Sequence, residues 1–179
     1  LGGILLARLL SPRDFGIYAV TIFVVLKLRA SSELGLNVRL IHDEQPSSDA
    51  QQRSVFTLHL LVAIAAYAVA YLLAPWLAAM FQLGSGGTAF FRLVGVSILI
   101  HPLSIVPAAL LARRLAYDRV TFGDLANGIV YQTAAVALAF GGFSFWSFGL
   151  ASLLSDLVRV LVLNVSAPWR FGLAWDGPY

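Results

Sequence analysis

The chain has 179 residues, of which 59% are hydrophobic and 12% are charged, and its formal net charge is +3. A soluble domain carries roughly 25% charged residues, so this chain lacks the polar groups that would cover a globular surface. Its mean hydropathy of +0.83 points to a lipid bilayer as its solvent. The scattered basic residues exclude the basic face that nucleic-acid binding requires. The absence of cysteine excludes disulfides and thiolate metal sites.

The apolar segments predict an all-α, polytopic transmembrane bundle of about six helices, the first of them truncated. The segments do not alternate between polar and apolar residues as the strands of a membrane barrel do. A full span takes roughly 20 residues, so we expect residue 1 to lie inside a helix of a longer protein. The expected spans are about 1–10 (partial), 15–36, 55–81, 88–112, 120–140 and 143–165, within one domain of residues 1–172 that is followed by a frayed tail at 173–179.

The turn after the first apolar run carries the signs of a helix start. Pro12 disfavours helical dihedral angles at Ser11, so Ser11 is the expected N-cap and Pro12 the first helical residue. Asp14 falls at the third helical position, where its carboxylate can accept a backbone N–H. Leu10 and Phe15 occupy the two positions of a hydrophobic staple.

This turn resembles the first interhelical turn of bacterial polysaccharide exporters, the O-antigen and exopolysaccharide flippases. Their superfamily of multidrug, oligosaccharidyl-lipid and polysaccharide (MOP) exporters also contains drug extruders and lipid II flippases. The matching residues of the turn are Arg8, Ser11, Pro12, Asp14, Phe15, Gly16 and Tyr18. Residues 33–41, 106–115 and 146–150 resemble, in order, the end of the family's second helix, the end of its fourth and the start of its sixth.

The resemblance implies a transporter whose two six-helix lobes face each other across a central cavity, with this chain supplying most of the N-terminal lobe. The implied function is translocation of lipid-linked oligosaccharide or polysaccharide repeat units across the bacterial inner membrane, by alternating access, in surface polysaccharide biosynthesis. The implied partners are an undecaprenyl-type lipid-linked oligosaccharide, membrane lipid and the missing C-terminal lobe of the same chain. No enzymatic activity and no cofactor are implied.

Three alternatives to the flippase stay open, and one of them is a structural membrane subunit without transport. A cation-coupled multidrug extruder of the same superfamily would present an apolar, acidic cavity, against which the arginines and lysine inside the spans argue. A membrane-embedded transferase would need His, Asp or Glu clustered at one membrane depth, which the sequence does not display.

Charges inside spans are costly and usually face a cavity or a partner. A pyrophosphate that crosses about 30 Å of hydrocarbon needs fixed positive charge, and a planar guanidinium can bind phosphate oxygens through two hydrogen bonds. The amide groups of Asn127 and Gln132 and the phenol groups of Tyr67 and Tyr131 would line the path of the sugars. The candidate substrate-binding residues are Arg92, Lys27, Arg29, Arg159, Gln132 and Asn127.

The alternative interpretation is that these charges only neutralise one another. Arg29 precedes Glu33 by four residues, and Asp156 precedes Arg159 by three, so both pairs can form on one helix face. Arg92 and Lys27 would then extend to the membrane interface. These two cations are favoured as site residues because neither has an obvious partner in the sequence.

Two prolines, Pro102 and Pro107, interrupt the fourth expected span. The resemblance to exporters that use bending helices makes them candidate hinges, and the favoured alternative is that they only shape the packing. No metal site is expected at the histidines, because His42 and its acidic neighbours lie in a polar loop without ligand spacing. His59 and His101 could relay protons, but each is expected to be a hydrogen-bonded structural residue.

Basic residues next to the spans set the expected orientation. By parity, the loops at 37–54 and 113–119 and the exit at 166–172 share one side of the membrane, and they hold six arginines. This side is expected to be cytoplasmic. Arg8 and Arg13, on the opposite side, go against the rule.

Overall fold

The computed structural model describes residues 2–32, 49–167 and 169, and every regular element within these residues is an α-helix. The all-α prediction is therefore confirmed. The helices are α1 (Gly2–Leu9), α2 (Pro12–Ser32), α4 (Asp49–Met80), α5 (Gly87–Gly95), α6 (Ser97–Ile100), α7 (Pro102–Arg113), α8 (Tyr117–Phe140) and α9 (Trp146–Ser166).

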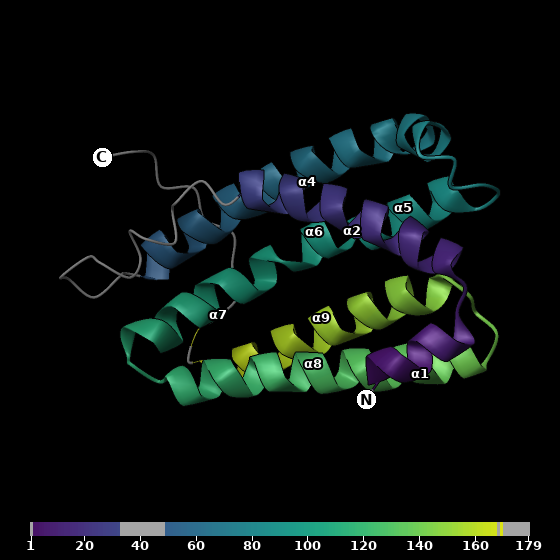
Figure 1. Cartoon of the computed structure of the whole chain (residues 1–179). Helices are drawn as coiled ribbons and strands as arrows, with labels where there is room; N and C mark the ends of the chain where they lie inside the picture. The colour runs from purple at the N-terminus through teal and green to yellow at the C-terminus, as the bar shows by residue number, and fades with distance from the viewer. Residues whose placement is uncertain (1, 33–48, 168, 170–179) are drawn as a thin grey trace.

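Helices α5, α6 and α7 follow one another with single-residue breaks and form one broken rod through the middle of the molecule (Figure 1). Counted with this rod, the bundle has the six helical units expected, among the residues described. Three stretches have the length and apolarity that crossing a membrane takes: Gln52–Met80, Gly87–Arg113 and Trp146–Ser166. Helices α2 and α8 carry more polar residues.

Several sequence-based predictions fall outside the described residues. They are the motif segment at 33–41, the loop that contains His42, the end of the second expected span and the tail at 173–179.

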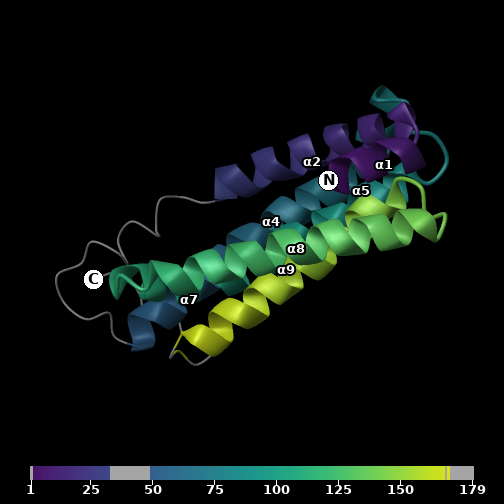
Figure 2. The same ribbon diagram turned by 60° about the horizontal axis from the view of Figure 1, so that its bottom comes forward.

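The broken rod separates two groups of helices. Helix α4 lies along one side of it, and α2 crosses both, while α8 and α9 lie along the other side (Figure 1). Helix α1 lies against α8, and α8 and α9 run side by side over most of their length (Figure 2). The polar helices α2 and α8 therefore border the same face of the molecule.

Small residues allow α4 to approach its neighbours closely, as their helical spacing predicts. Ala63 and Ala70 are buried in the main core cluster, and Ala66 packs against it. The centre of this cluster is the apolar face of α5, with Phe90, Phe91 and Val94 fully buried.

Gly149 brings α9 close to α5. A Cβ atom at this position would lie 2.6 Å from Cε2 of Phe90 and 3.1 Å from Cγ2 of Val94. Both side chains are fully buried and have no room to retreat. Glycine at the start of α9 therefore allows the edge-to-face contact between Phe90 and Trp146, whose ring centroids lie 5.5 Å apart.

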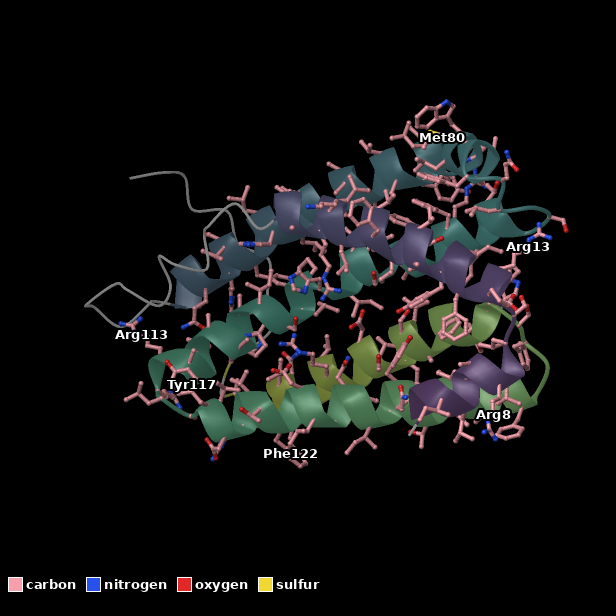
Figure 3. The ribbon with its side chains drawn as sticks, viewed as in Figure 1. Arg8, Arg13, Met80, Arg113, Tyr117 and Phe122 are labelled. Carbon is pink, nitrogen blue, oxygen red and sulfur yellow. The ribbon has the colours of Figure 1, made fainter. Side chains whose placement is uncertain are left out.

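The two ends of the bundle carry different basic residues. Arg8 and Arg13 lie at one end, and Arg113 lies at the other end together with Tyr117 (Figure 3). This separation agrees with the parity expected from the sequence. Phe122 points away from the bundle from the outer side of α8 and is 63% exposed.

We predict that Gly149→Ala destabilises the protein by about 1–3 kcal/mol, because the added methyl group overpacks a region that cannot yield. The matched control is Gly128→Ala in α8, where an added Cβ meets no atom within 4 Å. That change should be neutral or stabilising by up to about 1 kcal/mol, because alanine is the better helix former. Thermal unfolding in detergent measures both, and an equal effect of the two variants would contradict the packing argument.

Candidate functional site

The turn between α1 and α2 is a capping box, as predicted. Oγ of Ser11 accepts the backbone N–H of Asp14 at 3.3 Å, and Oδ2 of Asp14 accepts the backbone N–H of Ser11 at 2.9 Å and its hydroxyl at 2.6 Å. Leu10 and Phe15 pack into one cluster, as the hydrophobic staple requires. Ser11, Asp14 and Phe15 of the motif thus have a structural role in this turn.

Asp14 also connects this turn to a distant one. The hydroxyl of Ser144, in the turn between α8 and α9, donates to Oδ1 of Asp14, and the backbone of Phe145 contributes a further hydrogen bond. Asp14 lies in the first turn of α2, at the end of the bundle and before the apolar part of the helix. Burial raises the pKa of its carboxyl, but the hydrogen bonds from Ser11, Ser144 and Phe145 outweigh this effect, so the net pKa is lowered. The carboxylate therefore holds α1–α2 and α8–α9 together at this end of the bundle.

Halfway along the bundle, charged and polar side chains from four helical units meet. We refer to them as the ion cluster. Its members are Arg29 of α2, His101 and Ser104 at the start of α7, Asp124 and Asn127 of α8, and Asp156 and Arg159 of α9.

Arg29 connects α2 to two other elements of the cluster. Its Nη2 lies 2.6 Å from Nδ1 of His101, and its Nη1 lies 3.8 Å from Oδ2 of Asp156. A guanidinium carries only donors, so Nδ1 of His101 is the acceptor and its ring proton sits on Nε2. Arg29 thus joins α2 to both the broken rod and α9.

Arg159 forms the second half of the cluster. Its Nε donates to Oδ1 of Asp124 at 2.7 Å, and its Nη1 donates to Oγ of Ser104 at 3.2 Å. The hydroxyl of Ser104 in turn donates to the backbone carbonyl of His101 at 2.8 Å. Arg159 therefore joins α9 to α8 and to the same turn of α7 that Arg29 contacts.

Amide and phenol groups continue the cluster along α8. Asn127 donates a side-chain hydrogen bond to Asp156. Tyr131 lies one turn further along α8 and hydrogen-bonds Tyr18 of α2, whose ring stacks on Phe148. A row of polar side chains therefore runs between α2 and α8.

The cluster is partly open to the exterior. The side chains of Arg29 and Asp156 are 20% and 19% exposed, and those of Arg159 and Asp124 are 23% and 55% exposed. Two cations and two carboxylates thus face each other in a region that a polar ligand can reach. Each guanidinium can therefore release its carboxylate and bind another oxyanion, because it keeps a negative charge beside it throughout.

The pairing pattern differs from the one considered from sequence. Arg29 pairs with Asp156 across helices, and Arg159 pairs with Asp124 across helices. Glu33, the partner considered for Arg29, lies outside the described residues. Asp156 still experiences the charge of Arg159, its neighbour along α9.

Arg92 lies elsewhere, between α5 and α4. Its guanidinium sits 3.9 Å from the ring centroid of Tyr71, and its Nε donates to the carbonyl of Tyr71 at 3.4 Å. The hydroxyl of Tyr67 donates to the backbone carbonyl of Arg92 at 3.3 Å. The reason for favouring Arg92, its lack of a partner, is therefore wrong.

Lys27 projects from a different side of α2 than Arg29. Two residues correspond to about 200° around a helix, so the two cations diverge. The ammonium of Lys27 lies 5.8 Å from the ring centroid of Phe23, which is 61% exposed. Gln132 is half-buried on α8, next to Tyr131 in the chain.

The structure thus brings together three of the six candidates, Arg29, Arg159 and Asn127. Ser104 and His101 were not expected at this site: no role was predicted for Ser104, and His101 was predicted to be a structural residue. His101 directly precedes Pro102, and Ser104 follows it by two residues. Pro102 was the sequence signal that could have pointed to both, because a helix interrupted at a proline presents polar groups to its neighbours. His59 of α4 is buried and bonds the carbonyl of Val55 at 3.1 Å, as a structural histidine should.

Comparisons with known proteins bear on the whole chain. The family model described as "Polysaccharide biosynthesis protein" matches residues 5–179. The chain is 30% identical, over 159 residues, to the succinoglycan biosynthesis transport protein ExoT of Rhizobium meliloti (strain 1021). The match covers 87% of this chain but 31% of that relative, so the chain spans about a third of the relative's length. No solved structure matches the chain.

We predict that Asp14→Asn lowers stability by about 1.5–3 kcal/mol, because the substituted amide turns an N–H group toward donors that the carboxylate accepted. Asp118→Asn, at an exposed position in the first turn of α8, is the matched control and should cost less. Thermal unfolding in detergent compares the two variants.

The same pair of proteins tests the pH dependence. The pKa of Asp14 is lowered on folding, so its contribution is complete well above the ordinary value of 3.8 and is lost as the pH falls through the folded-state pKa. The stability difference between the native protein and Asp14→Asn should therefore shrink in acid. A difference that is constant down to pH 2 would show that the charge of Asp14 has no such role.

Proposed function

This chain belongs to the polysaccharide biosynthesis protein family, and from this premise we propose that it is one lobe of a membrane flippase. The flippase would translocate a lipid-linked oligosaccharide or polysaccharide repeat unit across the bacterial inner membrane by alternating access. The apolar helices and the name of the transport protein ExoT support this proposal.

The ion cluster is the observation on which the proposal depends. Arginine inside an apolar bundle is costly and persists where it meets a cavity or a partner. Here two arginines meet in one cluster, each held by a carboxylate that occupies the place an oxyanion of a substrate would take. We propose that Arg29 and Arg159 bind the phosphate groups of the lipid carrier as Asp156 and Asp124 withdraw.

The position of the cluster suits a large amphipathic substrate. The cluster includes residues of α2 and α8, which are not among the three stretches apolar enough to cross a membrane, and its side chains are partly exposed. Along α8, Asn127 and Tyr131 offer the amide and phenol groups that sugars bind, with Gln132 beside them. Arg92 and Lys27 lie outside the cluster, so we assign them no part in phosphate binding.

The rest of the transporter supplies the opposite wall of the cavity. Because the chain spans about a third of the length of ExoT, we propose that a second lobe of the same protein closes the path. The lipid tails of the carrier would remain in the membrane beside the bundle.

We predict that Arg29→Gln in the full-length protein lowers surface polysaccharide about tenfold or more at equal protein level. The reason is that a charged hydrogen-bonding group is worth about 1.5–3 kcal/mol. Arg29→Gln leaves Asp156 unpaired and can harm folding. The double variant Arg29→Gln/Asp156→Asn restores neutrality, and we expect it to fold normally and still not export.

The control for this experiment is Arg119→Gln, which removes a cation of α8 that bonds the carbonyl of Ser166 outside the cluster. Export by this variant should stay near the native level. Native export by the neutral double variant would remove Arg29 from the substrate site.

We also predict that residues 1–179 alone do not flip substrate, because one lobe forms one wall of the cavity. Reconstitution of this fragment and of the full-length protein in liposomes, followed by assay of flipped lipid-linked oligosaccharide, compares them. Flipping by the fragment would contradict the two-lobe proposal.

A further inference from the structure

Helix α7 begins with Pro102 and contains a second proline, Pro107, five residues later. A proline has no N–H, so Pro102 leaves the carbonyl of Ile98 without its helical donor, and Pro107 does the same to the carbonyl of Leu103. The two positions are nevertheless supported in different ways.

The kink at Pro107 is held by a neutral amide. Nδ2 of Asn164 in α9 donates to the carbonyl of Leu103 at 3.0 Å and to that of Val160 at 2.7 Å. Oδ1 of the same amide accepts the indole N–H of Trp169 at 2.8 Å. Pro107 itself is fully buried. The lost helical bond is therefore replaced by one from a neutral side chain of α9, which is itself held by two further hydrogen bonds.

The break at Pro102 is held by charged groups instead. Arg29 donates to Nδ1 of His101, the residue before the proline, and Arg159 donates to Oγ of Ser104, two residues after it. The turn at residues 101–104 therefore receives a guanidinium from α2 on one flank and a guanidinium from α9 on the other. Both guanidiniums belong to the ion cluster.

We propose that the junction between α6 and α7, at His101 and Pro102, is a hinge that Arg29 and Arg159 lock, and that an oxyanion of the substrate unlocks it. This inference rests on the proposed function, because the same two arginines bind the phosphate groups. Phosphate oxygens attract a guanidinium more strongly than a neutral imidazole or hydroxyl does. As the carboxylates withdraw, Arg29 and Arg159 therefore also release His101 and Ser104 to bind the substrate.

The consequence is a change of the angle between α5 and α7. Helix α5 is held to α4 by the contacts of Arg92 with Tyr67 and Tyr71, and α7 is held to α9 by Asn164. The break at Val96 and the break at His101 leave the short helix α6 between them. Substrate binding in the ion cluster thereby moves α7, which ends at Arg113, at that end of the bundle (Figure 3).

The test measures the bend directly in the full-length protein. The spin labels are placed at Ala89→Cys on α5 and Arg114→Cys just after α7, both exposed positions. These 179 residues contain no cysteine, and any cysteine elsewhere in the full-length protein is first replaced by serine. Electron paramagnetic resonance then gives the distribution of distances between the labels in nanodiscs. Inorganic pyrophosphate is the probe for the oxyanion, and its binding is measured separately by calorimetry.

Without ligand, we expect Arg29→Gln/Asp156→Asn and His101→Ala to shift or broaden this distribution relative to the native protein. Arg119→Gln, the matched loss of a cation outside the cluster, should leave the distribution unchanged. Pyrophosphate should shift the native distribution in the same direction as the two variants and should have no further effect on the variant that lacks Arg29.

The outcomes separate the two proposals. If the variants leave the distance distribution as in the native protein, the hinge is overturned, whether or not pyrophosphate binds. If the variants shift the distribution but pyrophosphate neither binds nor shifts it, the phosphate site fails, and unlocking by an oxyanion fails with it. If pyrophosphate binds without a shift, the site stands and the hinge is overturned.

Discussion

Four ionised groups inside an apolar bundle are tolerable only when each finds an opposite charge, and this requirement organises the middle of the molecule. Arg29 and Asp156 come from helices at opposite sides of the broken rod, and Arg29 also contacts His101 within the rod. Removing one member would leave another charge buried without compensation, which is far more costly than replacing the whole pair. The pairs therefore restrict how α2, α8 and α9 can rotate about their axes.

This central constraint differs in kind from the one at the end of the bundle. Asp14 accepts hydrogen bonds from Ser11, Ser144 and Phe145, all of them neutral donors of the turns themselves. A ligand has nothing to gain by competing there, because the carboxylate is already surrounded by donors. The ion cluster, in contrast, contains two guanidiniums, which are groups that can bind another oxyanion. The hydrogen bonds of Asp14 are suited to keeping helices together, whereas the ion cluster is suited to exchanging partners.

The broken rod shows the same division within a few residues. Pro107 is supported by an amide that also binds Trp169, whose ring packs edge-to-face with Phe56 of α4 at a centroid distance of 5.6 Å. Pro102 is supported by two arginines. Proline interrupts a helix in the same way at both positions, but the neighbouring donors differ: a neutral amide at Pro107 and two guanidiniums at Pro102.

The sequence by itself determined the parts that depend on neighbours along the chain. Its composition required an all-helical apolar bundle, and Ser11, Pro12 and Asp14 specified the start of α2, because a cap needs only residues three apart. It also located the charged residues within the apolar runs. Only the tertiary structure decided their partners: Asp14 meets Ser144 across 130 residues, Arg29 meets His101 across 72, and Arg159 meets Asp124 across 35. These contacts depend on the rotation and tilt of whole helices, which the packing of small and aromatic residues sets jointly, and no local spacing encodes that arrangement.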